Sequence, residues 1–216
     1  MKNTQEKDSF KNFLKETKEG FLVGIKDKKR WLICGIELLI VAALIVIDLL
    51  TKQYIYGYCV ENGKIEIIKG VISFTPTENT GASFGIFKGR TTALTIVSLI
   101  CAVVLFLFIF YSYPRRNLWL RSALILILAG AVGNIIDRLW LGYVRDFVYF
   151  ELINFAIFNF ADSCLTVGTI VLIIYMLVFY SKEEKEIEEK KKEKARQEAI
   201  EAAKTAEENA SSEEEQ

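Results

Sequence analysis

Four long apolar stretches constrain the fold of this chain more than any other feature of its sequence. They cover residues 31–55, 91–113, 118–141 and 152–180. A helix needs about 20 apolar residues to cross the hydrocarbon core of a bilayer. Soluble helices of that length carry a polar stripe, which these stretches mostly lack. The sequence therefore predicts an α-helical integral membrane protein with four transmembrane helices.

The basic residues near the ends of these stretches predict the orientation of the chain. They precede the first stretch, separate the second from the third, and follow the fourth: Lys26, Lys28, Lys29 and Arg30; Arg115, Arg116 and Arg121; Lys182 and Lys185. Because basic residues gather on the cytoplasmic side of a membrane, both termini are expected in the cytoplasm. We divide the chain into a charged head (1–30), a membrane domain (31–180) and a charged tail (181–216) that is partly helical or disordered.

Residue types that are absent or scattered exclude several classes of chemistry. The chain has no histidine, which excludes Ser-His and Cys-His catalysis and His-ligated zinc. Its 4 cysteines form no C-x-x-C pair, so the sequence predicts neither a metal site nor a redox motif. The basic balance is too weak for nucleic-acid binding by charge. We expect no cofactor and no nucleic-acid partner.

The external segment 56–90 has the pattern of a small β-sheet. Residues 64–67 alternate between charged and apolar side chains, residues 71–74 are of β-forming types, and Gly63 and Gly70 separate the runs. Short runs of this kind, bounded by glycines, are typical of strands. We expect a small sheet on the membrane surface, between the first two helices.

Charged side chains inside the predicted helices need a partner or a task, because burying a charge in hydrocarbon is costly. Asp48 and Lys52 are four residues apart on one helix face, in the order that favours an ion pair. They are expected to neutralise each other, to take part in function, or both. Asn134, Asp137 and Arg138 share a face of the third helix. There Asp137 is expected to be structural and to be held by Arg138 or by another basic group.

Two further aspartates, Asp146 and Asp162, are predicted to meet near the outer interface. If the fourth helix starts at residue 152, Asp162 lies about 15 Å into it, and a later start would bring it nearer the outer surface. Asp146 is expected just above it. Two close carboxyl groups share a proton, so that one takes a proton from water while the other hydrogen-bonds a scissile carbonyl. That chemistry hydrolyses a peptide without histidine, serine, cysteine or metal. The alternative is that one aspartate is an ordinary loop residue and the other pairs with Arg138 or Lys52.

Two other functions fit parts of the pattern. The relay groups of a small ion- or proton-coupled transporter would be Asp48, Asp137 and Asp162. Against this, the second helix carries no charge and the carboxylates gather toward one side. A Ser/Lys protease would pair Ser83 or Ser163 with Lys52, although neither serine lies in a nucleophile motif.

Five segments, taken together and in this order, resemble the lipoprotein signal peptidases, or signal peptidase II, which are integral-membrane aspartic proteases of bacteria. One ends the first apolar stretch, one lies in the external segment, and three lie around the third and fourth stretches. The segments are 48–52 (DLLTK), 79–84 (NTGASF), 133–138 (GNIIDR), 144–147 (VRDF) and 158–163 (FNFADS). The resemblance covers residues 31–180 and leaves out the head and the tail.

The resemblance implies a fold, a substrate and a set of site residues. It implies four helices with cytoplasmic termini in the bacterial cytoplasmic membrane, and a β-cradle on the outer leaflet. It implies a prolipoprotein substrate whose lipobox cysteine carries diacylglycerol, cleavage just before that cysteine, contact with membrane lipid, and inhibition by globomycin-type peptides. By motif position, Asp146 and Asp162 match the catalytic pair. The positions that match substrate-binding or site-supporting residues are Asp48, Lys52, Asn79, Gly81, Asn134, Asp137, Arg138 and Asn159.

The chain departs from the family pattern around Asp146. Arg145 stands where the family usually has an apolar residue, and Tyr149 stands where an acidic residue is common. The stretch between Asp146 and Asp162 is slightly short. These departures bear on the shape of the local loop.

Overall fold

The apolar stretches form helices in the computed structural model, which describes residues 28–82, 86–87, 89–111 and 117–180 and scattered residues between 182 and 200. Helix α2 (Lys28–Thr51) continues through a π-helical turn (Lys52–Tyr56) into α3 (Gly57–Asn62), past the predicted end at residue 55. Helices α4 (Thr91–Tyr111) and α5 (Leu118–Leu141) follow, and α6 (Phe160–Tyr175) runs on into a π-helical stretch (Met176–Tyr180). Among the described residues, 4 helical segments are long and apolar enough to cross a membrane, which confirms the predicted fold class.

The chain divides into two compact units, Met1–Val171 and Leu172–Gln216. The first unit holds α2 to α5, the strands and the first part of α6. Nearly all of the charged head and most of the charged tail lie outside the described residues. The predictions made for those two segments therefore stay predictions.

The fourth membrane helix begins at Phe160 and not at residue 152 as predicted. The apolar residues before it form a 3₁₀ turn (Glu151–Ile153) and an extended stretch in which Phe158 bridges to Val148. Apolar content alone does not distinguish a helix from such a segment. The depth of about 15 Å for Asp162, which assumed a start at residue 152, is therefore wrong. The alternative of a later start is confirmed, because Asp162 lies in the first turn of α6.

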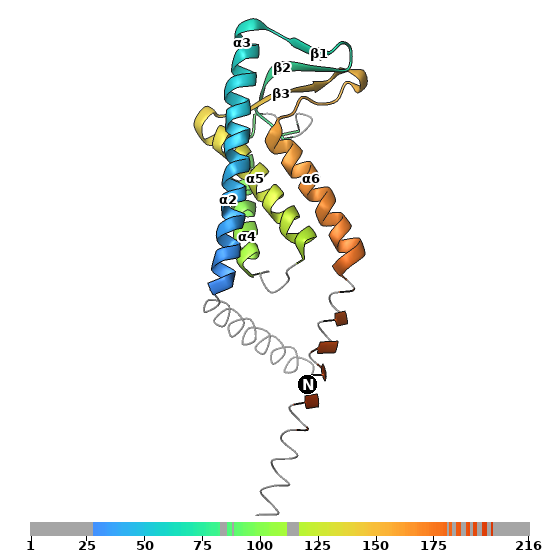
Figure 1. Ribbon diagram of the computed structural model, residues 1–216. Coiled ribbons are helices and arrows are strands. Elements are labelled where there is room, and N and C mark those ends of the chain that lie inside the picture. The colour runs from blue at the N-terminus through green and yellow to red at the C-terminus, as the bar shows by residue number, and fades with distance from the viewer. Residues whose placement is uncertain are drawn as a thin grey trace, which may run out of the picture. The chain divides into compact units, whose positions relative to one another are not determined.

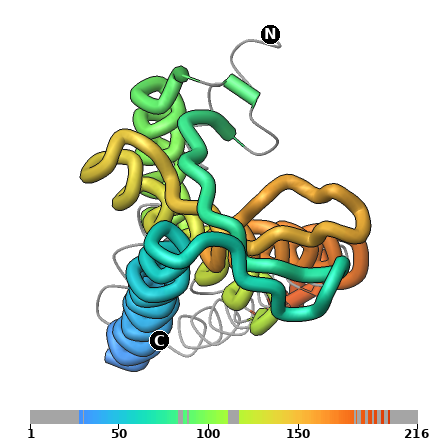
Figure 2. Tube along the Cα trace, turned by 90° about the horizontal axis from the view of Figure 1, so that it is seen from above, coloured from blue at the N-terminus to red at the C-terminus, as the bar shows by residue number. Residues whose placement is uncertain are grey.

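A three-stranded antiparallel sheet lies at one end of the helices (Figure 1). Its strands are β1 (Ile65–Ile68), β2 (Ile72–Asn79) and β3 (Val144–Phe150), in the order β1-β2-β3. The sheet predicted for the external segment is confirmed by β1 and β2. The third strand was not predicted, and it comes from the segment between α5 and α6. Seen from above, the sheet covers the N-terminal end of α6 (Figure 2).

Helix α5 is more enclosed than the helices before it. In its most apolar window 61% of the residues are buried, against 22% in the first membrane helix and 17% in α4. A Cβ at Gly130 would lie 2.4 Å from the carbonyl oxygen of Ala161 in α6, and one at Gly133 would lie 2.5 Å from Oδ2 of Asp48 in α2. Only residues without a side chain allow α2 and α6 to approach α5 so closely.

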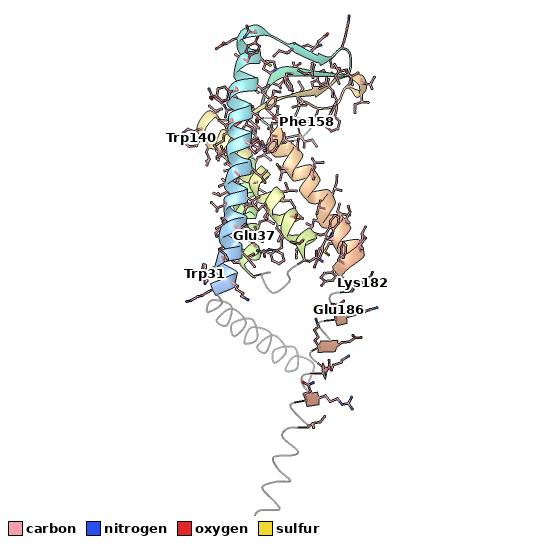
Figure 3. All side chains as sticks on the ribbon, viewed as in Figure 1. Trp31, Glu37, Trp140, Phe158, Lys182 and Glu186 are labelled. Carbon is pink, nitrogen blue, oxygen red and sulfur yellow. The ribbon has the colours of Figure 1, made fainter. Side chains whose placement is uncertain are left out.

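A buried ion pair joins three helices at the end away from the sheet. Arg121 in α5 donates from Nε and Nη2 to the two carboxylate oxygens of Glu37 in α2, and from Nη1 to the carbonyl oxygen of Ile109 in α4 at 2.7 Å. Figure 3 places Glu37 at this end of α2, far from Phe158 at the start of α6. Because the contact is bidentate, both charges are compensated. The pair holds α2, α4 and α5 together below the sheet.

Candidate active site

A reciprocal pair of side-chain caps closes the N-terminus of α6. Asn159 Oδ1 accepts a hydrogen bond from the backbone N–H of Asp162 at 2.9 Å, and Asp162 Oδ2 accepts one from the N–H of Asn159 at 3.1 Å. This is a capping box built from asparagine and aspartate. It explains why the helix begins at Phe160, and it fixes the Asp162 carboxyl group at the positive end of the helix dipole.

Asp48 and Lys52 of the first membrane helix reach the same place. Asp48 Oδ1 accepts from the N–H of Ala161 at 2.9 Å, and its Oδ2 accepts from Lys52 Nζ at 2.8 Å. The predicted ion pair is therefore confirmed. Lys52 is fully buried and also donates to Asn134 Oδ1 at 3.0 Å, with Asp137 Oδ2 3.5 Å away. One ammonium group thus links the first membrane helix to α5.

Asp146 lies on β3 and is held by two asparagine side chains. Its Oδ1 accepts from Asn159 Nδ2 at 2.7 Å, and its Oδ2 accepts from Asn79 Nδ2 at 2.9 Å. The residue is only 1% exposed. Burial first, and the charge of Asp162 second, raise the pKa of Asp146 to about 7, although the two asparagine bonds and the charge of Lys52 act in the opposite direction. Asp146 therefore titrates near neutral pH.

Two amide side chains connect the aspartates. Asn134 donates from Nδ2 to Asp162 Oδ1 at 2.8 Å, and Asn134 Oδ1 accepts from Asn159 Nδ2 at 3.1 Å. Since Asn159 also donates to Asp146, the path runs from Asp162 through Asn134 and Asn159 to Asp146. Among the described residues, neither aspartate forms an ion pair with Arg138 or with Lys52. The structure thus brings Asp146 and Asp162 into one polar cluster.

Asp137 is held by Arg145 and not by Arg138. Asp137 Oδ1 accepts from Arg145 Nη2 at 2.8 Å, and Asp137 Oδ2 accepts from the backbone N–H of Arg145 at 3.0 Å. Of the two expected partners of Asp137, Arg138 is wrong and another basic group is confirmed. In the sequence, Arg145 stood out only as a departure from the family pattern. The left-handed turn at Gly142, with φ 81°, ends α5 and brings Arg145 back beside Asp137.

Gly81 orders the end of β2 through its backbone. Its N–H donates to Asn79 Oδ1 at 2.9 Å, which leaves Asn79 Nδ2 directed at Asp146. Its carbonyl oxygen accepts from Arg138 Nη2 at 3.0 Å. The buried Nε of Arg138 has no hydrogen-bond partner among the described residues. The Nε–H of Arg138 can therefore donate a hydrogen bond to a further group.

A cavity of about 660 Å³ adjoins this cluster. Its charged and amide side chains are Asn79, Asn134, Arg138 and Asp162, and the hydroxyl groups of Ser98, Ser163 and Thr166 also line it. Most of the remaining wall is apolar and comes from α4, α5, α6 and the loop before α6, including Val97, Leu105, Ile127, Phe158 and Val167. Asp146 is not part of the wall and lies behind its two asparagines. The cavity thus places one carboxyl group of the pair beside a large apolar space.

The predicted Ser/Lys pairing finds no support in the described contacts. Ser163 donates to the carbonyl oxygen of Asn159 at 3.1 Å. The hydrogen bonds of Lys52 go to Asp48, Asn134 and the carbonyl oxygen of Gly133. Ser83 lies outside the described residues.

Comparison with known proteins places the chain in a family. The family model described as Signal peptidase (SPase) II matches residues 11–178. A lipoprotein signal peptidase of Lactiplantibacillus plantarum is 38% identical over 143 residues, which are 66% of this chain and 94% of that protein. One of Streptococcus thermophilus is 39% identical over 136 residues, 63% of this chain and 88% of that protein.

Two solved structures of bacterial membrane enzymes have a similar fold. One, obtained by the in meso method at 2.3 Å resolution, is 34% identical with a TM-score of 0.57, over 66% of this chain and 88% of that chain. The other, at 1.9 Å, is 34% identical with a TM-score of 0.56, over 67% and 94%. Sequence and fold therefore agree that the chain belongs to the signal peptidase II family of membrane aspartic proteases.

Proposed function

We propose that this protein removes the signal peptide from prolipoproteins whose lipobox cysteine carries diacylglycerol, cutting just before that cysteine. Its family, and relatives named lipoprotein signal peptidase, support prolipoprotein cleavage. Asp146 and Asp162 form the catalytic pair. The observation that carries this assignment is their shared network through Asn134 and Asn159, beside a largely apolar cavity.

The reaction needs one proton on the aspartate pair. Burial and the charge of Asp162 raise the pKa of Asp146 to about 7, so the two carboxyl groups share one proton near neutral pH. The ionised carboxyl group takes a proton from a water molecule, and the water oxygen attacks the carbon of the scissile carbonyl group. The protonated carboxyl group donates a hydrogen bond to the oxygen of that carbonyl group. A proton then passes to the amide nitrogen, the C–N bond breaks, and the cysteine leaves with a free amino group.

The remaining residues of the network hold the pair or receive the substrate. Those that hold it do so through the hydrogen bonds and ion pairs described above: Asp48, Lys52, Asn134, Asp137 and Asn159. Those on the substrate side are Asn79, Gly81 and Arg138. In this proposal the free Nε of Arg138 donates to a carbonyl group of the substrate.

The apolar wall of the cavity fits a substrate that arrives within the membrane. The protein is a multi-pass membrane protein, and both the signal helix and the lipid of a prolipoprotein are apolar. We place the sheet at the outer face of the bacterial cytoplasmic membrane, in contact with lipid, with both termini in the cytoplasm. Residues 31–180 form the peptidase domain in this proposal, with the head (1–30) and the tail (181–216) on the cytoplasmic side.

A cleavage assay on lipidated prolipoprotein tests the proposal. The full chain is compared with Asp146→Asn and Asp162→Asn, and the gel shift of the substrate is followed over time. Glu66→Gln provides the matched control, because Glu66 is an exposed acid on β1. We expect cleavage by the wild type and by Glu66→Gln, none by either aspartate variant, and inhibition by globomycin. Full activity in a folded aspartate variant would overturn the assignment of the pair.

The transporter alternative is not supported by the comparisons, which place the chain in a peptidase family. The charged groups also gather at two ends of the described helices, since Glu37 and Arg121 pair with each other far from the sheet. These observations favour a single hydrolytic site near the sheet.

A further inference from the structure

Arg145 makes a contact with Asp137 that involves both its main chain and its side chain. Its N–H donates to Asp137 Oδ2 at 3.0 Å, and its guanidinium donates from Nη2 to Oδ1 at 2.8 Å and from Nε to Oδ2 at 3.3 Å. Asp137 is 1% exposed, so its charge requires compensation inside the protein. This contact fixes Arg145, the residue directly before Asp146, to α5.

The same contact determines which carboxylate receives Lys52. Lys52 Nζ lies 2.8 Å from Asp48 Oδ2 but 3.5 Å from Asp137 Oδ2. It also donates to Asn134 Oδ1 at 3.0 Å, and Asn134 donates to Asp162. Without Arg145, Asp137 would be a buried anion with Lys52 as its nearest cation. Lys52 would then be drawn from Asp48 and Asn134, and the support of Asp162 would change.

The charges around the aspartate pair balance only if Arg145 is present. The buried or half-buried groups are four carboxyls (Asp48, Asp137, Asp146 and Asp162) and three cations (Lys52, Arg138 and Arg145). One proton on the pair leaves three negative charges against three positive ones. Four other titratable groups of the described residues face this region. Glu78 on β2 lies opposite Arg145, the phenols of Tyr56 and Tyr143 lie near Arg145, and the thiol of Cys164 lies near Asp48. Glu78 is exposed and faces solvent.

We propose that Arg145 is a positioning residue of this enzyme, which compensates Asp137, keeps Lys52 on Asp48 and Asn134, and so maintains the state in which Asp146 and Asp162 share one proton. The proposal rests on the proposed function. Removal of Arg145 leaves three negative charges against two positive ones. A second proton then enters the aspartate pair more readily, and the carboxylate that accepts a proton from water is lost until the pH is higher.

The test is the pH profile of kcat/KM for prolipoprotein cleavage by the full chain. For Arg145→Met we expect both limbs of the profile to move up by about one pH unit, with up to about tenfold less activity on the acid limb and up to about tenfold more on the alkaline limb. Arg145→Lys retains the charge and should restore most of the profile. Lys64→Met is the matched control, since it removes a cation directly before β1, where Lys64 pairs with Glu151 at 2.7 Å. Its profile should equal that of the wild type.

A double variant separates charge compensation from a merely structural contribution. Arg145→Met with Asp137→Asn removes one charge of each sign, and the amide oxygen can still accept the backbone N–H. We expect its acid limb to return to the wild-type position. If Arg145→Met alone does not fold, this double variant still tests whether Arg145 acts by compensating the charge of Asp137. Superimposable limbs for the wild type and Arg145→Met, or a double variant shifted as far as Arg145→Met, would overturn the proposal. Absence of cleavage by the wild type would instead overturn the proposed function.

Discussion

Replacing Asp146 by asparagine is expected to abolish cleavage and to stabilise the protein at pH 8. Asp146 is 1% exposed, and its pKa is raised from the ordinary 3.8 to about 7, by burial first and by the charge of Asp162 second. The native state therefore holds this proton at pH values where the unfolded chain has released it. Ionisation of Asp146 in the unfolded chain therefore lowers the free energy of unfolding as the pH rises from about 4 to about 7. Above about pH 7 this loss of stability is complete.

The size of the effect follows from the raised pKa. A difference of about three pH units corresponds to about 4 kcal/mol at pH 8, and to about 1.5 kcal/mol at pH 5. Asparagine removes this cost but loses a hydrogen bond, because its amide nitrogen must face the donor of Asn79 or Asn159. That loss is about 1 kcal/mol. The net gain is about 3 kcal/mol at pH 8, a rise in Tm of about 6–12 °C for a chain of this size, and near zero at pH 5.

Thermal unfolding of the wild type and of Asp146→Asn in the same lipid or detergent, at pH 5 and pH 8, measures the difference. The cleavage assay is run on the same samples. A gain in Tm confined to pH 8, together with loss of cleavage, would agree with a carboxyl group kept for catalysis at a cost to stability. A variant that is less stable than the wild type at pH 8, or equally stabilised at both pH values, would refute the reasoning.

Three further substitutions test how the site is held. Lys52→Met leaves buried carboxylates without their shared cation and should destabilise the protein by about 3 kcal/mol or more, measured as a fall in Tm. Gly130→Ala places a Cβ 2.4 Å from the carbonyl oxygen of Ala161 and should cost about 1–3 kcal/mol, whereas Gly35→Ala, with nothing within 4 Å, should be neutral or stabilising. Asn159→Ala removes a helix cap worth about 1 kcal/mol and the amide between the aspartates, so kcat/KM should fall far more than Tm. Near-normal kcat/KM would contradict the bridging role of that amide.

The sequence predicted best those features that depend on local spacing. Three of the four helical segments lie close to the apolar runs that predicted them, and the third, Leu118–Leu141, has the same bounds. The ion pair between Asp48 and Lys52 was predicted because residues four apart share a helix face. The start of α6 was missed because residues 152–158 are mostly apolar without being α-helical. The signal that would have placed it is the capping pattern of Asn159 and Asp162, three residues apart.

The contacts that complete the site are non-local, and no spacing rule predicts them. Lys52 reaches Asn134 across 82 residues of sequence, and Asn79 reaches Asp146 across 67. The first contact depends on the close packing that Gly133 allows between α2 and α5. The second depends on β3 joining the sheet. The resemblance to a family assigned these residues to one site, and the packing shows which of them touch.

The position of Asp146 depends on an irregularity in the pairing of β2 with β3. Thr77 pairs with Asp146, and Phe74 pairs with Val148, so β2 contributes one more residue than β3 between these pairs. Pro76 lies in this bulge, where it has no N–H to offer the ladder. Asn79 is two residues beyond Thr77 and therefore lies on the same side of the sheet as Asp146, to which it donates. Without the bulge the register beyond it would slip by one residue, and Asn79 would face the other side. The bulge in β2 thus couples the sheet to the aspartate pair, and the sheet is part of the site as well as a cover over α6.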